Sequence, residues 1–137
     1  MPLVSAAERG RDAVSAAEVE LPRDRSCGSR ARRWLEQQLP GGIGETTLDD
    51  LKLVTTELVE NALIHGRGRI VLRLEARRDA VRVEVTDEGK DAAIAIRTRG
   101  VEIGGWGLVL VDRLAKRWGA FEGTTHVWAE LPVVAED

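Results

Sequence analysis

Residues 57–66 read Glu-Leu-Val-Glu-Asn-Ala-Leu-Ile-His-Gly, and they close the longest stretch of helical periodicity in this 137-residue chain. Apolar residues recur there every three or four positions, which predicts a helix from about Thr47 to His65. Because Glu57, Asn61 and His65 are four residues apart, such a helix places their side chains in one polar stripe beside an apolar face.

The stripe combines a carboxylate, an amide and an imidazole. These groups suit, respectively, the acceptance of a proton, the binding of a hydrated cation and a hydrogen bond to phosphate. Polar residues that border an apolar helix face are more often simply exposed to solvent. His65 has a further alternative, because a histidine at a helix end can hydrogen-bond the last carbonyl groups. The stripe alone therefore does not establish a site.

A second polar motif, Asp87-Glu88-Gly89, follows a predicted strand over 80–86. An aspartate at the end of a strand usually forms a turn. At the mouth of a pocket it can instead accept a hydrogen bond from an exocyclic amine such as that of adenine. Taken alone, this motif is a weak signal.

A third motif, Gly104-Gly105-Trp106-Gly107-Leu108, opens a predicted helix from Gly107 to about Arg117. Glycines allow the backbone to approach a ligand, and the free N–H groups at a helix start favour anions. The motif is neither a P-loop, which needs Gly-Lys-Ser/Thr, nor a dinucleotide fingerprint, because no strand leads directly into it. It is a moderately specific signal for phosphate binding.

The order of the predicted elements indicates the fold class. Strands are expected at 17–21, 69–76, 80–86 and 125–131, helices at 26–39, 47–65 and 107–117, and a long loop at 87–106. We expect an α+β two-layer sandwich, in which a mixed, largely antiparallel sheet carries three main helices on one face. This domain is expected to span 16–134, after a mobile arm at 1–15.

Composition restricts the partners. With 23 acidic and 20 basic side chains the formal net charge is −3, which argues against a protein whose main ligand is nucleic acid. The cluster of Arg30, Arg32 and Arg33 is best interpreted as a solvent-exposed helix face. Docking of an acidic partner is the next alternative, and nucleic acid is the last.

The sequence contains no secretory signal and no apolar run long enough to cross a bilayer, so we expect a cytoplasmic protein without a membrane partner. The single cysteine, Cys27, cannot form an intramolecular disulfide. Three tryptophans, Trp34, Trp118 and Trp128, lie on apolar faces of predicted elements and are expected in the core.

Together the three motifs resemble a known family. Residues 57–66 resemble the N box of the histidine-kinase-like ATPase superfamily, which has the Bergerat fold. Asp87-Glu88-Gly89 resembles its first glycine box, and the segment from Gly105 to Leu108 resembles its second. The small size, the lack of a phospho-accepting histidine domain and the stretch from Leu110 to Gly119 resemble one branch, the anti-sigma-factor serine kinases and their single-domain actinobacterial relatives. The resemblance covers about 18–132.

The resemblance implies roles for individual residues. Glu57 is expected to be the general base and Asn61 the ligand of a Mg²⁺ that bridges the phosphates of ATP. Asp87 is expected to accept from the adenine amino group, beside Gly89. Residues 90–104 are expected to form a lid over the nucleotide. The complete set expected to bind the cofactor comprises Asn61, His65, Asp87, Gly89, Gly105, Trp106, Gly107, Leu108 and Thr125.

The family branch implies an ATP-binding regulatory protein that is a serine/threonine kinase. Its implied partners are a sigma factor, a serine-bearing anti-sigma antagonist, or both, and a homodimer is expected by analogy. Two departures argue against turnover, and the first of them favours an alternative, a non-catalytic nucleotide-responsive module that binds protein. Lys90-Asp91 replace the second glycine expected in the first glycine box, and His126 replaces a threonine expected before Val127.

Overall fold

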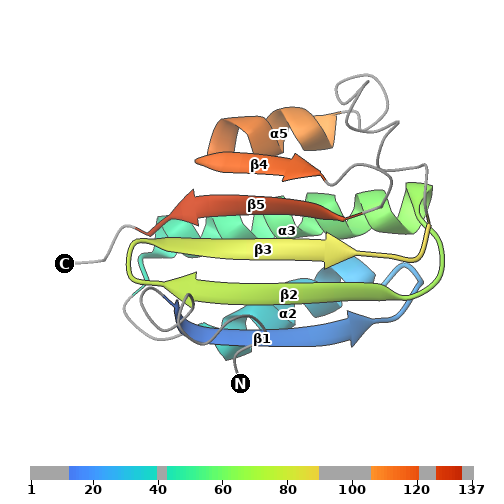
Figure 1. The fold of residues 1–137 in the computed structure, drawn as a ribbon, viewed down its shortest axis with the longest axis horizontal. Coiled ribbons are helices and arrows are strands. Elements are labelled where there is room, and N and C mark those ends of the chain that lie inside the picture. Colours follow the sequence, from blue (N-terminus) through green and yellow to red (C-terminus); the bar gives the residue numbers. More distant parts are fainter. Residues whose placement is uncertain (1–12, 40–42, 90–105, 121–125, 134–137) are drawn as a thin grey trace.

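The computed structural model describes residues 13–39, 43–89, 106–120 and 126–133 (Figure 1). In chain order the elements are β1 (Ala13–Leu21), α2 (Cys27–Gln38), α3 (Glu45–His65), β2 (Ile70–Arg77), β3 (Ala80–Thr86), α5 (Trp106–Leu114), β4 (Arg117–Ala120) and β5 (Val127–Pro132). No helix within these residues is long and apolar enough to span a membrane.

The five strands form one sheet in the order β1-β2-β3-β5-β4, and every neighbouring pair is antiparallel. The helices lie on one face of this sheet (Figure 1), so the predicted α+β two-layer sandwich is confirmed. A mixed sheet was expected, but the described strands pair only in antiparallel fashion. A tight turn at residues 78–79 joins β2 to β3, which makes this central pair an antiparallel hairpin.

The core lies between the sheet and the helices. Alternate residues of β3, namely Val81, Val83 and Val85, are buried against α3, as the period of two along a strand requires. Each fully buried valine or leucine side chain contributes about 1.5–3 kcal/mol relative to an exposed one. Helix α3 contacts α2, α5 and the three strands β2, β3 and β5. It is therefore the central helix, and it fixes the position of the polar stripe.

The opposite face of the sheet carries a network of alternating charges. Glu84 is 2.7 Å from Arg82 Nε, and Glu130 lies within 3.2 Å of both Arg82 and Arg117. We call this set the outer-face network; its members are Arg73, Glu75, Arg77, Arg82, Glu84, Arg117, His126 and Glu130. The same alternation that buries the valines of β3 directs these side chains away from the helices.

Trp128 also lies on the outer face, so its predicted place in the core is wrong. The Arg82 guanidinium is 4.2 Å from the centre of the Trp128 ring, a cation–π contact. A side chain at Gly119, the cross-strand neighbour, would come within 3.2 Å of the indole. The strand alternation, which the sequence does show, places Trp128 with Glu130 rather than with Val127. Trp34 and Trp118 do pack against the core, as predicted.

Two further boundaries differ from the predictions. Strand β1 begins at Ala13, inside the predicted arm at 1–15, and both Ala13 and Ser15 pair with β2; residues 1–12 lie outside the described residues. Helix α5 ends at Leu114 rather than near Arg117, and residues 117–120 form β4. The backbone N–H of Lys116 donates to Glu130 O at 2.7 Å, so pairing with β5 overrides the helical pattern there.

Candidate functional site

The polar stripe lies on the second half of α3. Asn61 is buried, with 7% of its surface exposed, while Glu57 and His65 are partly buried. The Asn61 side chain makes no hydrogen bond within the described part of the chain. Although the residue as a whole is largely buried, its amide atoms are not among the fully buried polar atoms that lack a partner, so they remain within reach of a ligand.

Glu57 has an altered proton affinity. Burial raises the pKa of its carboxyl group above the ordinary value, and the negative charge of Glu60 raises it further. Both effects disfavour the ionised form. A carboxylate whose pKa is shifted toward neutrality is a better proton acceptor at physiological pH than an ordinary glutamate.

Asp87 joins the end of β3 to the end of α3. Its Oδ1 accepts hydrogen bonds from the backbone N–H of Gly89 at 2.7 Å and of Arg67 at 3.3 Å. A Cβ atom at Gly66 would overlap the Asp87 carboxylate and would lie 2.7 Å from the carbonyl oxygen of Ala62. The first two motifs therefore meet in space, and Gly66 is required for their close approach.

Glu88 strengthens the same junction. Its backbone N–H donates to Arg67 O at 2.7 Å, and its carboxylate accepts from the backbone N–H of Arg69 at 3.1 Å. Gly68 has a φ of 68°, in the left-handed region, and a side chain there would collide with Glu88. Residues 66–69 thus form a turn whose shape depends on both acids of the second motif.

Arg23 is a residue of this region that sequence reasoning missed. It donates to three carbonyl oxygens: Nη2 to Ala62 at 3.0 Å, Nη1 to Leu63 at 2.8 Å and Nε to Gly68 at 2.7 Å. Arg23 therefore caps the C-terminal end of α3, which is the role proposed from the sequence, as an alternative, for His65. No local pattern reveals Arg23, because its partners are about 40 residues away in sequence.

The third motif is described only in part. Helix α5 begins at Trp106, so Gly107 and Leu108 lie in its first turn, and α5 packs against α3. The first turn of α5 lies toward the same end of the molecule as the C-terminal ends of α3 and β3, on the right in Figure 1. Gly105, Thr125 and the predicted lid at 90–104 lie outside the described residues, as does Lys90.

His126, one of the two sequence departures, belongs to the outer-face network. Its Nε2 is 3.1 Å from Glu84 Oε1, on the face of the sheet opposite to the helices. Its ring is therefore directed toward that network and not toward the stripe of α3.

A metal centre made by the protein alone is not found among the described residues, where no three acidic, histidine or cysteine side chains converge. Mg²⁺ that accompanies a nucleotide needs fewer protein ligands, because it takes most of its ligands from phosphates and water and only one or two from protein. The unpartnered amide of Asn61 is a suitable single ligand of this kind.

Comparison with known proteins gives the family of the chain. No curated protein is similar enough to count as a match. A family model described as the histidine kinase-like ATPase domain matches residues 22–130, which span most of the 137-residue chain. The match includes all three motifs and the residues that join them. The chain therefore belongs to the histidine kinase-like ATPase domain family.

Proposed function

We propose that this chain is an ATP-dependent serine/threonine protein kinase of the anti-sigma-factor type. Family membership supports ATP binding and a regulatory role. The observation that carries the proposal is the contact between Gly66 and Asp87, which brings the N box and the first glycine box together at one end of α3. The partners we propose are a sigma factor, its serine-bearing anti-sigma antagonist, or both.

Each described site residue has a proposed role. Asp87, held by the amides of Arg67 and Gly89, accepts a hydrogen bond from the adenine amino group. Asn61 ligates Mg²⁺, which supplies charge neutralisation at the phosphates. The first turn of α5, with Gly107, offers N–H groups to the same phosphates. Gly105, Trp106, Leu108, His65 and Thr125 remain proposed nucleotide contacts on the basis of the family resemblance.

Glu57 is the proposed general base. The serine oxygen of the partner forms a bond to the γ-phosphorus, the bond from that phosphorus to the bridging oxygen of ADP breaks, and the serine proton passes to Glu57. The raised pKa of Glu57 favours this transfer near neutral pH. Phosphoryl transfer depends mainly on positioning and charge neutralisation, which suits a site with few reactive groups.

The test is phosphorylation of a purified serine-bearing antagonist with labelled ATP. The Glu57→Ala variant should retain ATP affinity and lose transfer. Glu45→Ala is the matched control, because Glu45 is exposed at the opposite end of the same helix. Equal transfer by wild type and Glu57→Ala would remove Glu57 from the mechanism.

The second candidate is a nucleotide-responsive binding module without catalysis. Lys90-Asp91 in place of the second glycine of the first glycine box favours it. If the wild-type chain binds Mg-ATP but neither transfers nor hydrolyses it with any candidate partner, this second function replaces the first.

A further inference from the structure

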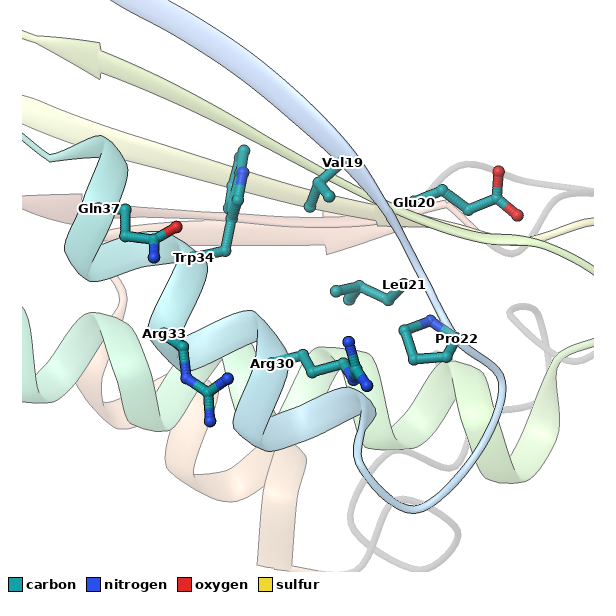
Figure 2. Close-up of a pocket in the computed structure, with 8 residues that line it drawn as sticks. All are labelled: Val19, Glu20, Leu21, Pro22, Arg30, Arg33, Trp34 and Gln37. Carbon is teal, nitrogen blue, oxygen red and sulfur yellow. The ribbon is translucent and has the colours of Figure 1, made fainter.

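A groove of about 200 Å³ opens between the edge strand β1 and helix α2 (Figure 2). Its apolar surface comes from Val19, Leu21 and Trp34, with Pro22 at one end. Leu21 is part of the core, while Val19 and Trp34 are only partly buried and pack against it. The groove therefore exposes apolar surface that continues from the core.

Arg30 and Arg33 add positive charge to this groove, and α2 supplies both (Figure 2). Arg33 has no hydrogen bond or ion pair within the described residues. Arg30 donates from Nε to Ser26 Oγ at 3.0 Å, a neutral partner. The third arginine of the cluster, Arg32, differs because it turns inward and donates to Thr56 Oγ1. Two arginines thus lie at an apolar groove in a chain whose net charge is −3.

The nearby carboxylates do not neutralise these arginines. Glu20 lines the groove, but its carboxylate points away from both guanidinium groups in Figure 2. The pKa of Asp24 is lowered mainly by hydrogen bonds from the side chain and backbone of Ser26, and the charge of Arg30 contributes less. Glu36 pairs with Lys52. The charge at the groove is therefore available for a ligand.

The backbone of β1 offers a further set of contacts. Strand β1 is at the end of the sheet order, so among the described strands it pairs only with β2. An edge strand presents alternate N–H and C=O groups on its unpaired side, which an extended peptide can hydrogen-bond. This unpaired edge runs beside the groove, since Val19 and Leu21 belong to β1.

We propose that the groove between β1 and α2 binds an extended, acidic segment of a partner protein. The segment adds to the edge of β1, places one apolar side chain against Trp34, and directs acidic side chains to Arg30 and Arg33. The apolar surface and the net negative charge of the chain disfavour nucleic acid as the ligand. The groove needs no nucleotide, so this inference goes beyond the proposed kinase function and is tested without ATP.

The experiment measures fluorescence anisotropy of a fluorescein-labelled synthetic peptide in which glutamate alternates with leucine. Arg33→Glu is expected to weaken binding to the full chain by about tenfold or more, because a charge-assisted contact becomes repulsive. Arg78→Glu is the matched control: Arg78 is an exposed arginine in the β2–β3 turn, and its reversal changes the net charge equally. Circular dichroism checks that both variants remain folded.

Changes in the peptide separate the three kinds of contact. Replacing glutamate by lysine, replacing leucine by glycine, and methylating alternate backbone nitrogens should each weaken binding. The proposal is overturned if the wild-type chain does not bind the acidic peptide at millimolar concentration, or if Arg33→Glu binds it as wild type does. Tighter binding of a single-stranded DNA oligonucleotide that displaces the peptide also overturns it.

Discussion

Two partly buried glutamates, Glu57 on α3 and Glu84 on β3, lie on opposite sides of the sheet and have opposite electrostatic environments. Burial alone would raise the pKa of Glu84, but hydrogen bonds and charge from His126 and Arg82 outweigh it and lower the pKa to about 2. At Glu57 burial and the nearby Glu60 act in the same direction, and the pKa is raised. No basic side chain pairs with Glu57 in the described part of the chain.

The difference distinguishes a region that stabilises the fold from the candidate site. In the outer-face network each carboxylate has arginine partners, so charges are neutralised within the protein. On α3, burial and Glu60 disfavour the ionised form of Glu57, and no arginine pairs with Glu57 or Asn61 among the described residues, which leaves both groups available to a ligand. Substitutions in the two regions should therefore affect different measurements.

The largest effect is expected from Gly66→Ala. The new methyl group must displace the Asp87 carboxylate and also approaches the backbone of Ala62, so the junction of the two motifs cannot form as observed. ATP affinity measured by calorimetry should fall by about tenfold or more. Gly28→Ala is the matched control, since a methyl group there meets only movable side-chain atoms, the nearest at 3.2 Å on Glu60. If Gly66→Ala binds ATP as tightly as wild type does, Asp87 is not part of the nucleotide site.

A smaller loss of affinity is expected for Arg23→Ala. Three hydrogen bonds to the end of α3 and to Gly68 are removed, and the turn that positions Asp87 becomes less ordered. Affinity for ATP and ADP should fall by the same factor, about three- to tenfold, because Asp87 is the proposed contact of adenine, which both nucleotides share, and not of the terminal phosphate. Arg23→Lys should recover part of the loss, and Arg25→Ala, an exposed neighbour, should have no effect. A changed ratio of ATP to ADP affinity would contradict this assignment.

Glu84→Gln should lower thermal stability without changing ATP affinity. The folded-state pKa of Glu84, about 2, is below the ordinary value of 4.5, so its stabilising effect is present above about pH 4.5 and is lost as the pH falls toward 2. The difference in melting temperature between wild type and variant should therefore be largest near neutral pH and should narrow over that acidic range. Glu20→Gln serves as the control, because the Glu20 side chain on β1 is exposed. A difference that is constant with pH would show that ionisation of Glu84 is not the cause.

The smallest effect, of opposite sign, is expected for Glu57→Gln. Because the folded-state pKa of Glu57 is raised, its ionised form destabilises the fold at pH values above that pKa. The variant should melt at a slightly higher temperature than wild type at pH 8, and the two should converge at pH 4, where the wild-type carboxyl is protonated. Thermal melts in the absence of nucleotide and metal measure this, and a lower melting temperature at pH 8 would contradict the unpaired state of Glu57.

Much of the fold could be predicted from the sequence, because its local signals agree with the tertiary structure. The period of α3 and the alternation in β3 are strong, and both elements were predicted to within about two residues. Strand β4 could not be predicted, since residues 117–120 lie where the predicted helix ends and form a strand only by pairing with β5. Trp128 was misplaced because an aromatic residue can pack under an arginine as well as in a core.

The candidate site was predicted in outline through its motifs, but not through its connections. The stripe on α3 and the acids after β3 are visible in the sequence, whereas the contact of Gly66 with Asp87 depends on the turn between them. The role of Arg23 could not be predicted either, because it donates to backbone carbonyl oxygens. Every residue carries such a carbonyl, so these hydrogen bonds leave no sequence pattern.

The most direct test of the account is a calorimetric titration of Mg-ATP into the full chain and into its Asp87→Asn variant. If the N box and the first glycine box form one nucleotide site, wild type should bind one equivalent of ATP and the variant should bind markedly more weakly, while both remain folded. Absence of ATP binding by wild type, or equal affinity of the two proteins, would contradict the account.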